Sequence, residues 1–347
     1  MKWTKTLMDW YQENKRDLSW RKSKNPYYIW LSEIILQQTR IAQGIPYYDR
    51  FIKKYPSVND LASAAEDEVL KLWQGLGYYS RARNLLTSAK WIVNENEGKF
   101  PTNHKDLLQL KGVGDYTASA IASICFNEKQ AVVDGNVFRF LARFFGIQTP
   151  IDHGSAHRIF KAKATQLMQR ELPGEFNQAL MEFGALHCTP KKPACASCPF
   201  SSNCFAFQQG KVDYFPIKTK RVKIITRYFN YLVVKTPLGK IIVHQRRGKG
   251  IWRNLYEFPL IESNENLSLT KLKNSLAQSD WKFGPIKNIH LMEPKPIKHI
   301  LSHQHLYLQF WSLEATEENP HAISKDQLNS LAVPIVIQDF IQKHCCD

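Results

Sequence analysis

Alternation of apolar and polar residues, the pattern of half-buried strands, is absent before residue 220 and common after it. The earlier segments instead carry apolar residues at helical spacing. We therefore predict an all-α region followed by a small α+β region. The helices expected in the first region are one before the segment LSWRKSKNP, then Pro26–Gln43, 46–55, 58–64, 66–74, 80–96, 136–146, 155–171 and 175–187.

The two regions are separated by residues 211–223 (KVDYFPIKTKRVK), which are charged, contain Pro216 and lack periodicity. We interpret this stretch as a linker. Beyond it, residues 225–236 and 240–247 are apolar and β-branched and flank the turn PLGK, which predicts a β-hairpin. The remaining elements expected in this region are a helix near 268–279, a strand at 299–314 and a helix near 335–344.

Glu33 lies in the middle of the most apolar predicted helix, between Trp30 and Leu36. Burial disfavours the charged form of a carboxyl group, so we expect its pKa to rise until it can carry a proton near neutrality. That property suits a catalytic acid. The alternative is a carboxylate that caps a buried network or reaches solvent. The polar residues that follow, including Gln38, could contact bases or sugars.

The segment LKGVGDYTASA contains two glycines, Gly112 and Gly114, directly before a helix of small residues. Glycine permits a positive φ and a close approach of the backbone to a ligand, and a helix N-terminus favours an anion. We interpret the segment as a phosphate-binding turn. Asp134 and Asn136 follow in a second loop. An ordinary helix start beside a solvated loop is the alternative.

A second turn bracketed by glycines, GLGYYSRARN, covers residues 75–84. It interleaves Tyr78 and Tyr79 with two arginines. This combination suits a surface that wedges a base step and holds phosphates. Equally, one tyrosine could belong to the core and the arginines to a solvated face.

The chain of 347 residues has a formal net charge of +16. Residues 1–217 hold 28 Lys and Arg against 20 Asp and Glu, and residues 218–347 hold 19 against 11. Both regions are therefore basic, which favours a polyanionic partner such as nucleic acid over excess charge for solubility. The amphipathic N-terminus is no signal peptide, and no window is apolar enough to span a membrane. We expect a soluble cytoplasmic protein, nucleoid-associated in a bacterium.

Four of the seven cysteines lie close together in the segment CTPKKPACASCPFSSNC. Six, two and five residues separate Cys188, Cys195, Cys198 and Cys204. In a chain without a secretory signal, such clustering indicates metal or cluster ligation rather than disulfides. One compact run of four cysteines is typical of an iron–sulfur cluster, whereas structural zinc usually takes two separated pairs. Zinc stays open as the alternative.

Taken together, these motifs resemble the MutY adenine DNA glycosylases of the helix-hairpin-helix superfamily. The resemblance covers essentially the whole chain, and its C-terminal part is looser and Nudix-like. The segments that carry it, in the order of the family, are WLSEIILQQTR, GLGYYSRARN, LKGVGDYTA, VVDGNVFR, FNQALMEFGALHC and the four-cysteine loop.

The resemblance implies a multidomain protein: an all-α helix-hairpin-helix glycosylase domain with an iron–sulfur cluster loop, followed by an α+β Nudix-like domain. The helical domain would cover residues 1–210 and the Nudix-like domain 224–347, joined by the linker at 211–223. Within the helical domain, a six-helix subdomain would cover about 25–133. The cluster subdomain would combine 1–24 with 134–210.

The resemblance also implies a monomeric base excision repair enzyme. Its partner would be double-stranded DNA with adenine opposite 8-oxoguanine or guanine, and it would hydrolyse the N-glycosidic bond of the adenine. Glu33 would protonate adenine at N7 and Asp134 would stabilise the positively charged sugar. Tyr116 and Asn136 would support them, and Arg21 would line the pocket.

Other matching positions imply contacts with DNA and a cofactor. The hairpin glycines would grip the backbone, and Gln38 and Tyr78 would enter the helix. The segment LSHQH resembles the loop that inspects 8-oxoguanine, with Ser302 and His303 as the matching pair, although the family more often has Phe at Leu301. The four cysteines would hold a [4Fe-4S] cluster, with neighbouring lysines facing phosphate.

Relatives that also nick DNA carry a nucleophilic lysine where this chain has Tyr116. The resemblance therefore implies a monofunctional glycosylase. The alternatives are a bifunctional pyrimidine glycosylase-lyase, which a trapped borohydride Schiff base would identify, and a non-catalytic DNA-binding module. A Nudix hydrolase needs clustered glutamates for divalent cations. Glu257, Glu262 and Glu265 form no such cluster, so we expect the second domain to bind rather than hydrolyse.

Overall fold

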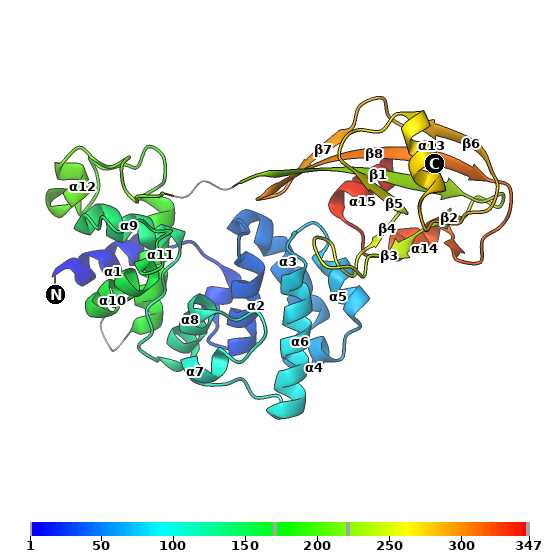
Figure 1. Cartoon of the computed structure of the whole chain (residues 1–347). Helices are drawn as coiled ribbons and strands as arrows, with labels where there is room; N and C mark the ends of the chain where they lie inside the picture. Colours follow the sequence, from blue (N-terminus) through cyan, green and yellow to red (C-terminus); the bar gives the residue numbers. More distant parts are fainter. Residues whose placement is uncertain (1, 169–171, 220–222, 345–347) are drawn as a thin grey trace. The chain divides into compact units, whose positions relative to one another are not determined.

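A computed structural model describes residues 2–168, 172–219 and 223–344 (Figure 1). Its contacts divide the chain into two compact units. The first unit combines residues 1–63 with 84–220, and the second combines 64–83 with 221–347. A helical segment from the first half of the chain therefore groups with the C-terminal region. The domain boundaries given by the sequence stay a prediction.

Every regular element in the first unit is helical within the described residues, as the pattern predicts. Helix α11 is central, because it contacts α1, α8 and α9, while α2 packs on α3 and α8. The elements are α1 (Lys2–Asn14), η1 (Ser19–Lys22), α2 (Pro26–Leu36), α3 (Ile41–Lys54), α4 (Val58–Ala62), α6 (Ser80–Glu95, from Asn84), α7 (His104–Leu107), α8 (Asp115–Phe126), α9 (Gly135–Phe145), α10 (Ala156–Leu167), α11 (Pro173–Leu186), η2 (Ser201–Asn203) and α12 (Phe205–Gln208).

One predicted helix is wrong in its length. The helix expected over Pro26–Gln43 ends at Leu36, and α3 begins at Ile41. Gln38 adopts a left-handed backbone with a φ of 57°, which no α-helix accommodates. The polar residues between the two helices therefore form a loop. The last residues of the helix predicted over 155–171 lie outside the described part of the chain.

Aromatic rings fill the core around α9 and α11. The ring of Phe140 lies 4.4 Å from that of Phe183 and stacks on Trp3 at 5.7 Å. Phe200, which lies within the cysteine segment between Cys198 and Cys204, is 5.4 Å from Phe140 and 5.1 Å from Phe183. Burying one such side chain contributes roughly 1.5–3 kcal/mol. The core therefore anchors the cysteine loop to two helices.

Helix α11 approaches its neighbours closely through glycine and asparagine. Asn177 is fully buried and donates to Ser123 Oγ at 2.8 Å and to the carbonyl of Gln130 at 2.7 Å. A Cβ atom on Gly184 would lie 2.6 Å from the carbonyl oxygen of Asn136 in α9. Only a glycine fits there, so the first turn of α9 rests directly on α11.

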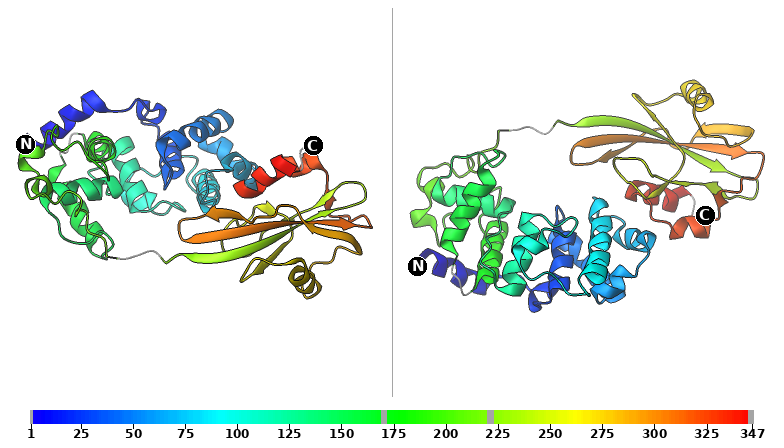
Figure 2. Two further views of the ribbon diagram at one scale, coloured as in Figure 1. Left: turned by 90° about the horizontal axis from the view of Figure 1, so that it is seen from above. Right: turned by 60° about the horizontal axis from the view of Figure 1, so that its bottom comes forward.

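The second unit is a mixed sheet with helices on both faces (Figure 2). The long strands β1 and β8 are parallel neighbours, and the strand order is β6-β8-β1-β2-β9, with β5 on β1 and β7 on β8. The strands are β1 (Ile225–Lys235), β2 (Ile241–Ile242), β5 (Leu260–Ser263), β6 (Ile286–Leu291), β7 (Ile297–Ile300), β8 (Gln304–Ala315) and β9 (Ala322–Ile323), with β3 (His244–Gln245) and β4 (Tyr256–Glu257) as a separate pair.

Successive residues of β8 face opposite helices because side chains alternate along a strand. Phe310 stacks on Phe340 of α15 (Ile335–His344) at 3.7 Å between ring centroids. Trp311 belongs to the opposite core, which includes Leu272 of α13 (Leu269–Ala277). Both helices occur where the sequence predicts them. Helix α14 (Lys325–Ser330) follows β9.

Two predicted strands differ from the structure. The strand expected over 299–314 is a hairpin of β7 and β8, and Leu301, Ser302 and His303 form its turn. The second arm of the hairpin expected at 240–247 is broken into β2 and β3, and only Lys235 and Ile241 pair across it. The main partner of β1 is β8, a long-range pairing that a local pattern does not reveal.

Helix α5 (Glu66–Trp73) and the turn after it pack on the sheet unit. Lys71 donates to the carbonyls of Asn329 and Leu331 at 2.7 and 2.8 Å. Asn254 donates to Glu66 at 2.5 Å. Polar contacts therefore attach residues 64–83 to the second unit at several points.

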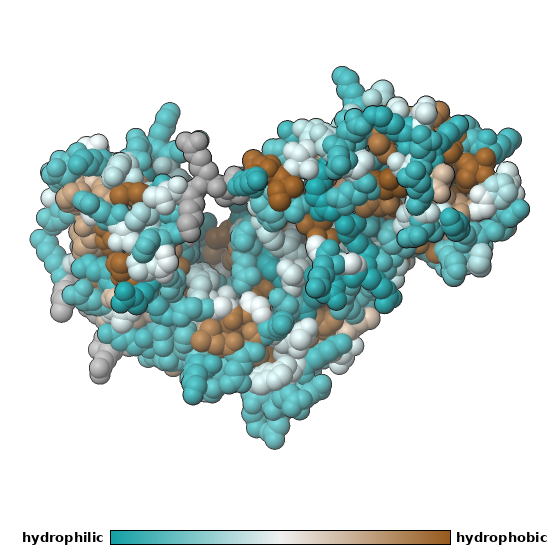
Figure 3. Space-filling view, in the orientation of Figure 1, coloured by the Kyte–Doolittle hydropathy of each residue, from teal (hydrophilic) through white to brown (hydrophobic). Residues whose placement is uncertain are grey.

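The visible surface of both units is mostly hydrophilic, with apolar residues in small separate patches (Figure 3). Large exposed apolar side chains include Ile300, Tyr214 and Leu238. None of the helices in the described residues has the length and apolar character needed to cross a membrane.

We predict that Gly184→Ala lowers the free energy of unfolding by about 1–3 kcal/mol, because the added methyl group would force α11 away from α9. Gly154→Ala is the matched control, since a Cβ atom there meets nothing within 4 Å. Chemical denaturation of both variants measures the difference. Equal stability of the two variants would show that the close approach is not required.

Candidate active site

A cavity of about 420 Å³ in the first unit brings together five of the residues singled out in the sequence. Glu33 comes from α2, Tyr116 from α8, and Asp134 and Asn136 from the start of α9, while Arg21 comes from η1. The other lining residues include Trp20, Ile29, Leu36, Arg40, Gln178, Met181 and Glu182.

The carboxyl group of Glu33 is held in apolar surroundings by α2. Asn25 caps this helix by accepting from the backbone N–H of Tyr27, and Pro26 occupies its first turn. Desolvation raises the pKa of Glu33 to about 7, and the nearby charge of Asp134 adds to the rise. A hydrogen bond with Tyr116 and the charge of Arg21 act in the opposite direction. Glu33 can therefore hold a proton near neutrality.

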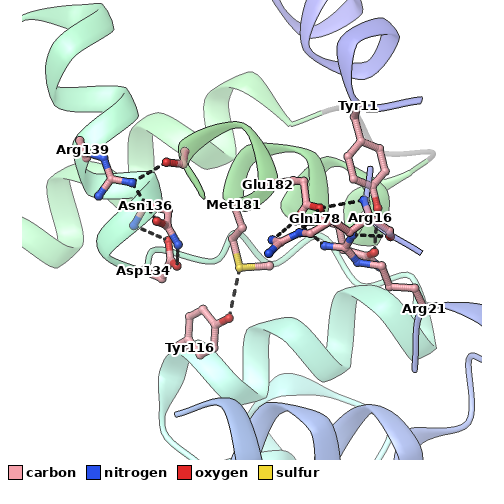
Figure 4. A network of polar contacts seen from close by, with 11 residues as sticks. Tyr11, Arg16, Arg21, Tyr116, Asp134, Asn136, Arg139, Gln178, Met181 and Glu182 are labelled. Carbon is pink, nitrogen blue, oxygen red and sulfur yellow. Dashed lines mark hydrogen bonds and ion pairs between the residues drawn. The ribbon is translucent and has the colours of Figure 1, made fainter. Parts of the chain in front are cut away.

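Tyr116 supplies a hydroxyl group that stays protonated. Burial and the carboxyl groups of Glu33 and Asp134 raise its pKa well above the ordinary value. Its hydroxyl donates to the sulfur of Met181 at 3.1 Å (Figure 4). The hydroxyl group has one proton, so it can donate either to Met181, as here, or to Glu33, which also lies within its reach.

Asp134 is the N-cap of α9 and accepts three hydrogen bonds. The backbone N–H groups of Asn136 and Val137 donate at 2.9 and 2.8 Å. Nδ2 of Asn136 donates at 2.7 Å (Figure 4). Arg139 orients this amide by donating to its Oδ1 atom at 2.8 Å. The Asp134 carboxylate is thus fixed in place by the first turn of one helix.

The start of α9 favours the anion of Asp134, and the three hydrogen bonds act in that direction. Burial has the larger effect, however, and the pKa of Asp134 is raised from its ordinary value. The sequence does not reveal that this loop is covered. The hydrogen bonds that favour the anion are therefore present, and burial outweighs their effect on the pKa of Asp134.

The two hairpin glycines differ in conformation. Gly112 has a φ of +80°, and a Cβ atom there would lie 2.9 Å from Asn84. Gly114 is the N-cap of α8 with a φ of −95°, so only Gly112 needs the left-handed region. The adjacent Asp115 forms an ion pair with Lys161 at 2.6 Å. The turn itself therefore has the tight geometry that the sequence predicts.

Four other predicted DNA-contact residues, Gln38, Tyr78, Ser302 and His303, lie outside this cavity. Ser302 and His303 line a separate cavity of about 490 Å³ in the second unit together with Tyr78, which lies in the turn after α5. The hydroxyl groups of Tyr78 and Ser302 form a hydrogen bond. Gln38 is exposed in the loop between α2 and α3 of the first unit.

The four clustered cysteines line one small cavity with Phe140, Phe183 and Phe200. Arg143 donates to the sulfur of Cys188 at 3.5 Å and to the carbonyl of Thr189 at 2.7 Å. Desolvation raises the pKa of Cys198 to about 11. Within the described residues, no three His, Cys, Asp or Glu side chains meet closely enough to hold a single metal ion.

This donor set fits a polynuclear cluster. Four thiols surround one apolar space, and a guanidinium group beside Cys188 can compensate negative charge on the sulfurs. The ligands are thiolates in such sites, so a cluster would have to overcome the raised pKa of the buried thiols.

The sequence reasoning missed Glu182 and Arg16, which line the same cavity as Glu33. Glu182 is 1% exposed and accepts hydrogen bonds from Arg16 and Arg21. Glu182 lies in an apolar helix between Met181 and Phe183. A carboxylate within an apolar helix is the pattern that identified Glu33, and the same pattern in α11 identifies Glu182.

Comparison with known proteins gives two family matches. Residues 31–165 match the family described as HhH-GPD superfamily base excision DNA repair protein, and residues 230–343 match the NUDIX domain. The first match contains Glu33, Tyr116, Asp134 and the hairpin glycines.

Individual relatives agree with these matches. An adenine DNA glycosylase of Arabidopsis thaliana is 39% identical over 78% of this chain, which spans about half (49%) of that protein. One from Buchnera aphidicola (subspecies Baizongia pistaciae) is 34% identical over 87% of this chain and 83% of the relative.

Solved structures resemble part of this chain. A thermostable thymine-DNA glycosylase is 31% identical with a TM-score of 0.56, and the match covers 60% of this chain and 95% of that one. Endonuclease III in a non-covalent DNA complex is 21% identical with a TM-score of 0.53 over 60% and 94% of the two chains, which shows a shared fold. The chain therefore belongs to the adenine DNA glycosylases, hydrolases of the HhH-GPD superfamily that act on N-glycosyl bonds, and it carries a C-terminal Nudix-like domain.

Proposed function

We propose that this protein removes adenine paired with 8-oxoguanine or guanine from double-stranded DNA by hydrolysing the N-glycosidic bond. The observation that carries the proposal is the Glu33 carboxyl group, whose pKa of about 7 lets it hold a proton beside Asp134 in a cavity of about 420 Å³. The relatives named adenine DNA glycosylase support adenine as the base.

Glu33 acts as the general acid. Adenine is a poor leaving group as an anion, and a proton delivered to N7 lets it depart as a neutral base. An acid whose pKa lies near the working pH is protonated often enough to act and still releases its proton readily. Tyr116, as a hydroxyl donor beside Glu33, orients the carboxyl group.

Asp134 acts as the anion that stabilises the sugar. Departure of the base leaves positive charge on the ring, which a fixed carboxylate offsets. The hydrogen bonds from Asn136 and Val137 favour the ionised form and hold it in place. Glu33 has a raised pKa of about 7, so the two carboxyl groups of one cavity can take different protonation states.

The reaction ends with hydrolysis, without strand cleavage. A lyase needs an amine nucleophile at the sugar. Tyr116 occupies the position of the lysine, and its raised pKa keeps the phenol protonated. The described residues that line the cavity include two acidic side chains at the site of chemistry but no lysine. These observations support a monofunctional enzyme over a glycosylase-lyase.

The C-terminal domain recognises the base opposite the adenine and has no hydrolase activity of its own. Ser302 and His303 offer hydrogen-bonding groups at the tip of an exposed hairpin, and Tyr78 lies beside them. Glu257 is buried and paired with Arg246 at 2.8 Å, so it is committed to the fold. Glu262 and Glu265 are paired with Arg227 and Lys271, and none of the three is set up for a metal.

Cys188, Cys195, Cys198 and Cys204 hold a [4Fe-4S] cluster. When bound by these four cysteines, such a cluster would cross-link a loop that has little regular structure and would supply a centre capable of electron transfer. Lys191 and Lys192 are exposed beside the first cysteine and face DNA phosphate. The functional form is a monomer bound to duplex DNA.

We predict that Glu33→Gln lowers single-turnover adenine release from an A:8-oxoguanine duplex about 10²–10⁴-fold, because glutamine has no proton to donate. The wild-type rate should fall about tenfold per unit well above pH 7, because Glu33, with a pKa of about 7, acts only when protonated, and it should fall again at acid pH, where Asp134 becomes protonated. The exposed Glu13→Gln is the control and should keep the wild-type profile. Unchanged excision by Glu33→Gln would refute the mechanism.

We predict that Ser302→Ala reduces the preference for adenine opposite 8-oxoguanine over adenine opposite cytosine by about tenfold, because the site loses a hydrogen-bonding group. Single-turnover rates on duplexes with 8-oxoguanine, guanine or cytosine opposite adenine measure the preference. Tyr78→Phe removes the other member of the hydrogen bond and tests whether that contact matters. Equal wild-type rates on all three duplexes would contradict the specificity.

We predict that the purified protein contains about four irons per chain, with a visible absorption band that Cys198→Ser abolishes. Cys125→Ser is the control, since Cys125 lies in α8 outside the cysteine loop. Elemental analysis distinguishes the two metals proposed for this site. Stoichiometric zinc in place of iron would rule out the cluster.

A further inference from the structure

Glu182 of α11 is the most heavily bonded carboxylate described in the first unit. It is 1% exposed and accepts five hydrogen bonds. Arg16 donates from its backbone N–H at 3.0 Å, from Nε at 2.8 Å and from an Nη atom at 2.6 Å. Arg21 donates from both Nη atoms at 3.0 and 2.8 Å (Figure 4). Both guanidinium groups are therefore bidentate.

These bonds fix one wall of the cavity. Arg16 lies in the segment that joins α1 to η1 and Arg21 lies within η1, and Arg21 also donates to the carbonyl of Arg16 at 3.1 Å. The guanidinium of Arg21 lies 5.8 Å from the ring of Tyr11, a cation–π contact. Arg21 is held from three sides, and a single carboxylate supplies most of the bonds.

The same group of side chains carries a net charge. Burial acts to raise the pKa of Glu182, but the hydrogen bonds from Arg16 and Arg21 outweigh it and lower the pKa to about 2. Glu182 is therefore ionised at every working pH. Two guanidinium groups and one carboxylate have a net charge of +1. Arg21 lines the cavity that holds Glu33, so this net charge acts on Glu33.

We propose that Glu182 is a positioning residue for excision: it fixes Arg21 at the cavity wall and limits the charge that acts on Glu33 to a single unit. The inference rests on the proposed function, because it concerns the proton that Glu33 donates. It gives two residues, Glu182 and Arg16, a role in the reaction without contact to the base.

Other groups also act on Glu33, and the test must separate them from Glu182. The titratable and charged groups that face it or line its cavity are Tyr116 and Cys125 of α8, Asp134 at the start of α9, Arg21 of η1, and Arg16, Arg40 and Glu182 around the same space. A purely structural role for Glu182 would tie α11 to the N-terminal segment and leave the proton affinity of Glu33 unaffected.

Two substitutions change the charge in opposite directions. Glu182→Gln removes the carboxylate and leaves two positive charges, which favour the Glu33 anion. Arg16→Gln removes one guanidinium and leaves no net charge, while the bidentate contact between Arg21 and Glu182 is kept. The single-turnover rate falls at alkaline pH as Glu33 loses its proton. We expect this fall, the alkaline limb of the pH profile, to move to lower pH in Glu182→Gln and to higher pH in Arg16→Gln, each by about half a pH unit or more.

Lys15→Gln is the matched charge control, because Lys15 lies next to Arg16 but bonds to Gln12. The alkaline limb of the Lys15→Gln pH profile should stay at the wild-type pH. The inference would be overturned if the alkaline limbs of Glu182→Gln and Arg16→Gln stayed in place or moved in the same direction. If Glu182→Gln does not fold, Arg16→Gln alone decides by the direction of its shift. Failure of the proposed function is distinct, since Glu33→Gln would then excise adenine normally.

Discussion

The desolvated carboxyl group of Glu33 is the constraint on which the site depends. Its pKa reaches about 7 because α2 is apolar on nearly every side and burial desolvates the group. Asp134 lies in the same cavity but accepts three hydrogen bonds from the first turn of α9. Both carboxyl groups are desolvated, and the chemistry therefore rests on one difference: Asp134 has three donors arranged to stabilise its anion.

Helix α11 sets the relation between these groups. Asn177 bonds it to α8, which carries Tyr116, and Gly184 lets the first turn of α9 rest on its backbone. Met181 and Glu182 then face the cavity from the same helix. One small residue and one buried amide thus place two helix starts and their functional side chains around a single space. A shift of α11 would disturb the donors of Asp134 and the partner of Tyr116 together.

Local sequence patterns predict the parts of this site that depend on local physics. A carboxylate in an apolar helix, an aspartate before a helix start and a tight glycine turn are each visible in a few residues, and Glu33, Asp134 and Gly112 were found that way. The break at Gln38 was missed, because a left-handed residue between two helical patterns leaves little trace. The pairing of β1 with β8 and the attachment of residues 64–83 to the sheet unit arise from long-range contacts, which no local pattern contains.

Electrostatic balance explains why a general acid can work beside arginine. A guanidinium group at the cavity wall favours the Glu33 anion, and this would remove the proton on which the reaction depends. Desolvation must therefore exceed the effect of every nearby cation. Glu182 reduces what desolvation has to overcome, because its own charge is secured by two bidentate partners and cannot be titrated away at neutral pH. A buried carboxylate that never changes its charge thus helps its neighbour in the cavity to keep a proton.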